Sequence, residues 1–137
     1  MANPFPDLSD DTFSYTVAER LPVEVLVFEV APDHVDEFLA VDHDVWTLGE
    51  ASILGDDEPI PFRSKEVWLD DAHPGRVTLV FVWESLAAWM RVGTEANMER
   101  LQSEFDARFP HEVKLVAAPH EDSDHGIHRV SRFERVD

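Results

Sequence analysis

The stretch FRSKEVWLDDAHPGRVTLVFVWE, which spans Phe62–Glu84, decides the fold predicted for this chain. Two runs rich in β-branched and aromatic residues flank a cluster of turn-forming residues, which is the pattern of a β-hairpin with a longer loop. Side chains alternate along a strand, so the odd-numbered residues of Val77–Trp83 share one face and the even-numbered ones share the other. Both sets are largely apolar. The second arm of the hairpin is therefore expected to be covered on both sides.

The bulk composition indicates one globular domain. The chain has 137 residues, 44% of them hydrophobic, with four Trp, which suffices for a single core. No apolar run approaches the roughly 20 residues of a membrane span, and the start of the sequence lacks the pattern of a secretory signal. There is no Cys, so neither a disulfide framework nor thiolate chemistry is expected. The cytoplasm is the expected location.

Net charge is the most unusual bulk property. The formal charge is −18 at pH 7. Nucleic acids and anionic lipid surfaces would be repelled by such a chain and are excluded as partners. A solvated acidic surface is the first interpretation, and a surface that binds cations is the alternative.

The chain divides into an acidic arm over residues 1–20 and one folded domain over residues 21–137. Within the domain, Ser85 and Thr94 are suited to cap two consecutive helical segments, and Pro110 ends the second. The expected elements are a strand at 23–30, a helix that opens at Pro32, a loop at 48–61, the hairpin, the two helical segments, and short strands at 113–116 and 126–133.

The order strand, helix, hairpin, helix, strand is the split βαβ pattern of an α+β, ferredoxin-like sandwich. It gives a four-stranded antiparallel sheet with two helices on one face. No further helix is available for the other face, and each apolar side chain left in water there would cost about 1.5–3 kcal/mol. Two-fold dimers are the commonest oligomers. We therefore expect a homodimer, joined through the open sheet faces into an α+β barrel.

Asp42 is the first candidate for a catalytic residue. In the helix that follows Pro32, Phe38, Leu39 and Trp46 lie on one apolar stripe, and Asp42 falls near its middle. A carboxyl group in apolar surroundings is expected to have a raised pKa, which suits a general base. The alternative is a structural hydrogen bond to a neighbouring donor. His43 is a second candidate, as a proton shuttle, with simple exposure as the alternative.

The four tryptophans are candidates for a pocket that holds a flat aromatic ligand, and core packing is the alternative for each of them. Glu66 shares a strand face with one of these tryptophans, although a salt bridge with Lys65 would explain it equally well. Gln102 borders the apolar face of the helical segment that follows Thr94. The substrate-binding candidates are Trp46, Glu66, Trp68, Trp83, Trp89 and Gln102.

The loop near the end of the chain is rich in metal-ligating residue types. It carries His120, His125 and His128, with Asp122 and Asp124 between them. These residues lack the spacing of a metal-binding motif, so no metal site is expected.

Three short motifs carry a resemblance to a known superfamily. They are Asp42-xxx-Trp46-Thr47, Lys65-Glu-Val-Trp68 and Val82-Trp-Glu-Ser-xxx-Trp89. In this order they resemble an uncharacterised branch of the dimeric α+β barrel superfamily, which includes antibiotic-biosynthesis monooxygenase-like proteins. The likeness covers roughly residues 23–116. The acidic arm, an insertion at 55–61 and the loop around 120–125 depart from it.

The resemblance implies a cofactor-independent monooxygenase-like or isomerase-like enzyme. It would act on a small apolar or aromatic molecule between the helices and the sheet, with Asp42 as the base. Haem-degrading members use an Asn, a Trp and a His. This chain has Leu26 or Val27, Val92 and Gln102 near those positions, so no haem and no other cofactor is expected. The alternative is a non-catalytic homodimer, either a small-ligand binder or a stress-related accessory protein, in which donors tie up Asp42.

Overall fold

The computed structural model describes residues 13–55 and 60–135 of the chain. Its strands are β1 (Phe13–Glu29), β2 (Phe62–Leu69), β3 (Arg76–Trp83), β4 (Lys114–Ala117) and β5 (His128–Arg135). Its helical segments are η1 (Pro32–His34), α1 (Val35–Val41), η2 (Asp42–Thr47), α2 (Leu48–Ala51), α3 (Leu86–Val92), α4 (Glu95–Arg108) and α5 (Pro119–Asp122).

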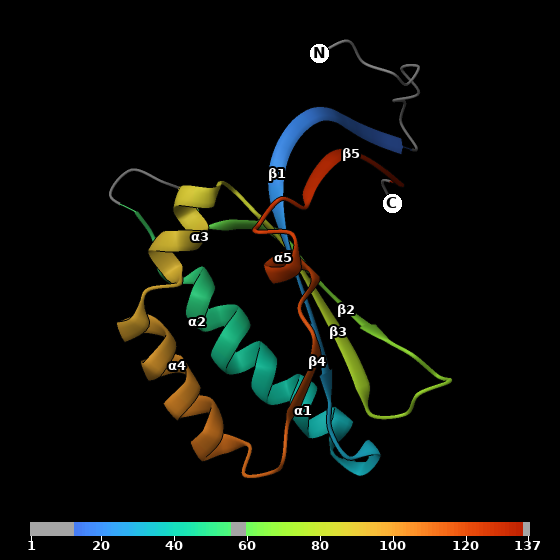
Figure 1. The fold of residues 1–137 in the computed structure, drawn as a ribbon, viewed down its shortest axis with the longest axis vertical. Coiled ribbons are helices and arrows are strands. Elements are labelled where there is room, and N and C mark those ends of the chain that lie inside the picture. The colour runs from blue at the N-terminus through green and yellow to red at the C-terminus, as the bar shows by residue number, and fades with distance from the viewer. Residues whose placement is uncertain (1–12, 56–59, 136–137) are drawn as a thin grey trace.

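Four strands form an antiparallel sheet in the order β2-β3-β1-β4, and the major helices lie together on one side of it (Figure 1). This order and these connections confirm the predicted α+β, ferredoxin-like split βαβ fold. The fifth strand, β5, pairs with the first half of β1. Figure 1 shows the two strands extending together beyond the helical layer.

Three element boundaries differ from those expected. β1 begins at Phe13 and runs without a break through residue 20, the expected end of the acidic arm, whose residues 1–12 lie outside the described part of the chain. The sequence predicts a loop that begins at Leu48. This prediction is wrong for Leu48–Ala51, which continue the helix as α2. A Cβ at Gly49 would lie 2.7 Å from the Leu101 side chain, so α2 packs closely against α4 there. The polar loop near the end contains the single turn α5.

The helix caps predicted from the sequence are confirmed. The Ser85 hydroxyl accepts a hydrogen bond from the Ala88 backbone N–H (3.0 Å), and the Thr94 hydroxyl accepts one from the Asn97 N–H (3.3 Å). Each satisfies a donor that a helix start leaves unpaired.

The hydrophobic core lies between the helices and the inner face of the sheet. The odd-numbered residues of Val77–Trp83 are all buried in it. Trp83 stacks on Trp89 of α3, with ring centres 5.6 Å apart and planes 4° from parallel. The part of the prediction that assigns one face of β3 to the helices is confirmed.

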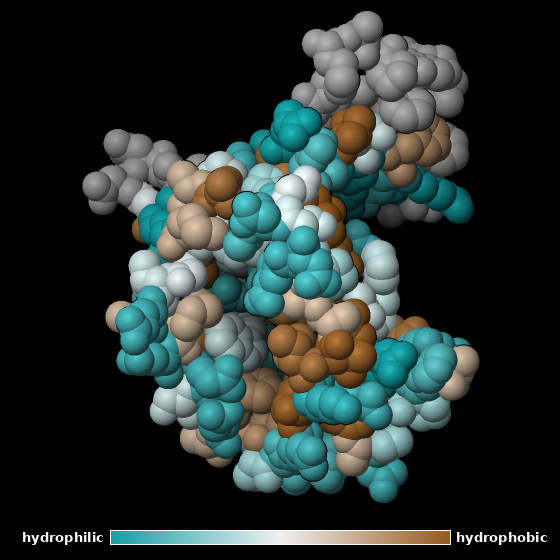
Figure 2. Space-filling model, viewed as in Figure 1, coloured by the Kyte–Doolittle hydropathy of each residue, from teal (hydrophilic) through white to brown (hydrophobic). Residues whose placement is uncertain are grey.

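The outer face of the sheet is apolar but less covered. The register places Val25 opposite Val80 and Val27 opposite Thr78, and all four side chains are only partly buried. Trp68 of β2, the other neighbour of β3, also pairs with Thr78 and is 54% exposed. Apolar side chains are also exposed over β4 (Figure 2). No helix among the described residues is long and apolar enough to cross a membrane.

Candidate functional site

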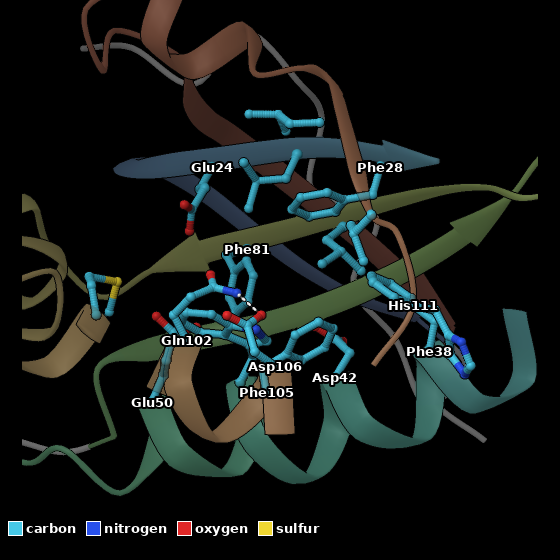
Figure 3. A pocket seen from close by; sticks show the side chains of 16 residues that line it. Glu24, Phe28, Phe38, Asp42, Glu50, Phe81, Gln102, Phe105, Asp106 and His111 are labelled. Carbon is cyan, nitrogen blue, oxygen red and sulfur yellow. Dashed lines mark hydrogen bonds between the residues drawn. The ribbon is translucent and has the colours of Figure 1, made fainter. Parts of the chain in front are cut away.

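A cavity of about 420 Å³ lies between the helical layer and the inner face of the sheet (Figure 3). This volume is within the usual range of small-molecule sites. Five aromatic side chains from β1, β3 and the helices form much of its wall: Phe28, Phe38, Trp46, Phe81 and Phe105. Its polar groups come from β1, the helices and the segment between α4 and β4: Glu24, Asp42, Glu50, Gln102, Asp106 and His111.

A stretch of π-helix supplies one side of the site. Between α1 and α2 the helix widens to a π-helix over Asp42–Thr47. Such segments occur often at functional sites, because they break the regular spacing of side chains. Here Asp42 and Trp46 both line the cavity, and Asp42 is only 2% exposed. The one carboxylate predicted on the apolar stripe therefore does reach a cavity.

Asp42 is paired with a buried lysine. Lys65 of β2 donates from Nζ to Asp42 Oδ2 and to the Thr47 hydroxyl, and the side chains of the two charged residues are 6% and 3% exposed. The same ammonium lies 5.1 Å from the centre of the Phe81 ring. Burial raises the pKa of Asp42, while the charge and hydrogen bond of Lys65 act in the opposite direction. The raised pKa expected for Asp42 is confirmed.

Glu24 enters the cavity from β1. It lies opposite Phe81 in the sheet, and Phe81 lies opposite Lys65, so the three side chains form a row across the inner face. Its carboxylate accepts a hydrogen bond from Trp83 Nε1 (3.1 Å). Burial raises the pKa of Glu24 to about 7, although the Trp83 hydrogen bond and the Lys65 charge partly offset this.

Glu50 enters from α2, on the opposite side of the cavity from Glu24 (Figure 3). The residue is only 7% exposed. Within the described part of the chain, no hydrogen-bond or ion-pair partner is found for its carboxyl group. Burial, reinforced by the charge of Glu24, raises the pKa of Glu50 to about 8. Carboxyl groups with pKa values near neutrality can both accept and donate a proton at physiological pH.

His120 of α5 lies next to Glu24 but does not line the cavity, and it is 4% exposed. Its Nδ1 is 3.0 Å from the Val25 carbonyl oxygen, which can only accept, so Nδ1 carries the proton. Its Nε2 then faces Glu24, at 4.0 Å from Oε2. Among the described residues, no group of three or more His, Asp and Glu side chains is placed to hold a metal ion.

Three of the predicted site residues meet at the cavity. These are Asp42, Trp46 and Gln102, whose amide donates to Asp106 (2.8 Å). His43 is exposed and does not line the cavity, and it affects Asp42 only through its charge.

The other predicted binding residues lie elsewhere. Trp83 and Trp89 are buried in the core, where Trp83 supports Glu24 without lining the cavity. Glu66 and Trp68 point to the outer face of the sheet, where the indole N–H donates to the carboxylate (3.1 Å). A wall of four tryptophans is therefore not formed, and Phe28, Phe38, Phe81 and Phe105 line the cavity together with Trp46.

Sequence reasoning missed Glu24, Glu50 and Lys65. Each looked like a solvent-facing charge in its own segment, and Lys65 looked like a surface partner for Glu66. Strand register would have identified Glu24 and Lys65, because both lie opposite the inward-facing Phe81. Glu24 also alternates in phase with Leu26 and Phe28, which line the cavity.

No family profile matches the chain, and no curated protein matches it significantly. Solved structures of similar fold include an antibiotic biosynthesis monooxygenase, with 18% identity, a TM-score of 0.40, and coverage of 69% of this chain and 93% of that one. A protein from Shewanella oneidensis has 17% identity, a TM-score of 0.46, and coverage of 90% and 97%. A protein from Mycobacterium tuberculosis has 19% identity, a TM-score of 0.41, and coverage of 70% and 93%.

The name antibiotic biosynthesis monooxygenase belongs to the group of proteins that the sequence motifs resemble. With TM-scores below 0.5, these similarities assign neither a reaction nor a substrate to this chain.

Proposed function

We propose that the cavity binds a small apolar or aromatic molecule and that Asp42 removes a proton from it. The observation that carries this proposal is a cavity with aromatic walls that opens directly onto Asp42. Lys65 engages only Oδ2 of this carboxylate. The other oxygen, Oδ1, is left for the substrate, so Lys65 acts as the group that orients the base.

Proton removal leads to one of two outcomes for the substrate anion. In an isomerase-like reaction, Glu24 or Glu50 returns the proton to a different atom, for which their pKa values of about 7 and 8 are suited. In a monooxygenase-like reaction, the anion passes one electron to O₂ and combines with the resulting superoxide. The resulting peroxide anion takes up the proton to become a hydroperoxide, which loses water together with the remaining hydrogen of the same carbon, so one oxygen atom stays in the product as a carbonyl. Neither route needs a cofactor.

One observation favours the alternative, a non-catalytic protein that binds a small ligand. The ion pair with Lys65 occupies Asp42, as expected if that carboxylate is structural. On this alternative the pair stabilises the helix against the sheet, and the cavity stores or carries its ligand unchanged.

A proton-exchange experiment separates the two. The probe is a naphthyl-substituted β-diketone, which is apolar, aromatic and carries an acidic C–H. Deuterium incorporation is followed by NMR and O₂ uptake in parallel. We expect the wild-type protein to accelerate exchange and Asp42→Asn to lose about a hundredfold to ten-thousandfold of that rate.

The matched control is Asp36→Asn, an exposed aspartate of α1 that does not line the cavity. It should keep the wild-type rate. If exchange with the wild-type protein is no faster than in buffer, and Asp42→Asn lowers only stability, the non-catalytic function is correct.

We further propose that a second copy of this chain covers the outer face of the sheet. Val25, Val27, Val80 and Trp68 leave apolar area in water there. The paired first half of β1 and β5 extends past the helical layer, where it can reach over such a partner (Figure 1). Two-fold pairing of identical faces buries both at once.

A further inference from the structure

We infer that the ligand of the cavity is a small organic cation, an amine whose ammonium group sits between Glu24 and Glu50 and whose apolar or aromatic body lies against the phenylalanine wall. This inference rests on the proposed ligand cavity and adds the charge of the molecule that fills it. It does not depend on whether the bound molecule is turned over.

The charges around the cavity are of one sign. Among the described residues that line it, four are Asp or Glu, and none is Lys or Arg. Lys65 neutralises one of them, Asp42, from outside the lining. The single lining histidine, His111, is already within 2.9 Å of the Glu37 carboxylate. His120 Nε2 lies 4.0 Å from Glu24 Oε2 but does not line the cavity. No lining residue is therefore left to give Glu24 or Glu50 a cation, and an anionic ligand would be repelled.

Glu50 is the group that points to a ligand. A glutamate residue that is more than nine-tenths buried normally has a partner for its carboxyl group, because leaving that group unpaired costs free energy. No described residue supplies a donor to Glu50, although Glu24 has Trp83. An ammonium group in the cavity would give Glu50 its missing partner and would also separate the two like charges.

The walls suit the rest of such a molecule. An ammonium group is attracted to the faces of aromatic rings, and carboxylates beside aromatic rings form the usual cages for organic amines. Lys65 already makes this contact with Phe81, 5.1 Å from its ring centre. A bound amine would make the same kind of contact with the rings that line the cavity.

Binding of a cation should release protons. When the cavity is empty, burial raises the pKa of Glu24 to about 7 and that of Glu50 to about 8. The charge of Glu121 adds to the first shift and the charges of Glu24 and Asp42 add to the second, while Lys65 lowers both pKa values. A positive charge beside these groups favours their ionised forms and lowers both values. At neutral pH an amine is therefore expected to displace about one proton for each molecule bound.

Three probes of one shape test the inference: naphthylethylamine, naphthylethanol and naphthylpropanoate. Their binding to the full chain is measured by titration calorimetry at neutral pH and fixed ionic strength, in two buffers of different ionisation enthalpy. We expect the amine to bind at least about tenfold more tightly than the alcohol, with proton release, and the carboxylate to bind most weakly. Glu50→Gln should remove most of the preference for the amine and leave the affinity for the alcohol within about twofold.

Glu104→Gln is the control for general attraction to an acidic protein, because Glu104 is exposed on α4 and does not line the cavity. It should retain the wild-type preference. Equal affinity for amine and alcohol, or tighter binding of the carboxylate, overturns the cationic ligand and leaves the ligand cavity standing. Absence of binding by all three probes overturns both.

Discussion

Lys65 joins the sheet to the helical layer through a buried charge. It is a buried ammonium that holds Asp42 and Thr47 across the gap between β2 and the π-helix. Ion pairs of this kind add little when both partners are present, since desolvation offsets attraction, but removal of one partner leaves an uncompensated buried charge. Lys65 therefore ties the stability of the helix–sheet contact to the state of the candidate base.

Lys65→Met is expected to lower the free energy of unfolding by about 3–5 kcal/mol, because Asp42 would remain buried without its cation. Urea unfolding followed by circular dichroism measures this. Arg108→Met is the matched control, since the pair of Arg108 with Asp44 is nearly half exposed on both sides and should contribute at most about 1 kcal/mol. Equal losses in the two variants would show that the Lys65 pair behaves as a surface pair.

Glu50 and Glu24 predict how stability changes with pH. Their pKa values in the folded protein, about 8 and 7, exceed the ordinary value of 4.5 because both are buried. The folded state then holds more protons than the unfolded state, so the stability present below the ordinary value is lost as pH rises through the folded pKa values. The side chain introduced by Glu50→Gln cannot ionise, so the free energy of unfolding of this variant should fall less steeply as pH rises.

Each unit of pKa difference corresponds to about 1.4 kcal/mol, so Glu50→Gln should exceed the wild-type protein in stability by a few kcal/mol at about pH 9. Urea midpoints measured across the range from acidic to alkaline pH test this. Parallel curves for the two proteins would mean that Glu50 ionises in the folded state as easily as in the unfolded state.

Part of the candidate site could be predicted from single residues, and part could not. Asp42 was identifiable because a carboxylate interrupts an apolar helical stripe, and helical periodicity is local information. Glu24 and Lys65 alternate with apolar neighbours in strands, where one face is usually wet, so nothing local marks them as buried. The position of Glu24 depends on the pairing of β1 with β3, which is distant in sequence, and the burial of Lys65 depends on Asp42, which lies 23 residues earlier in the chain.

At the scale of elements, local signals predicted most of the fold. The hairpin over Phe62–Trp83 and the two helix starts followed from turn formers and capping residues. The errors lie where tertiary contacts override local signals. Pairing with β5 extends β1 toward the start of the chain, and α2 continues the helix where Gly49 packs closely against Leu101 of α4.

Ser85→Ala is expected to destabilise the fold by about 1 kcal/mol, because the first turn of α3 loses the acceptor for the Ala88 N–H. Thermal or chemical unfolding measures the change. Ser103→Ala is the matched control, since this residue is exposed inside α4, where alanine is a better helix former than serine. A cap that contributes nothing would leave the two variants equally stable.

At the scale of the molecule, the outer face of the sheet governs association. In Trp68→Arg, a charge replaces an apolar side chain that is 54% exposed in one copy and would lie within the proposed interface. Sedimentation velocity at micromolar concentration should show a dimer for the wild-type protein and a shift toward monomer for the variant. Leu86→Arg, on α3 and 49% exposed, should leave the dimer intact. A wild-type protein that sediments as a folded monomer would contradict this interface.

The stacked pair of Trp83 and Trp89 equips the protein with an optical reporter of its own chemistry. The Trp83 indole donates to Glu24, so a proton gained or lost by that carboxylate changes the electric field on a fluorophore sealed in the core. Occupancy of the interior can thus be followed by intrinsic fluorescence, without a label or a known reaction.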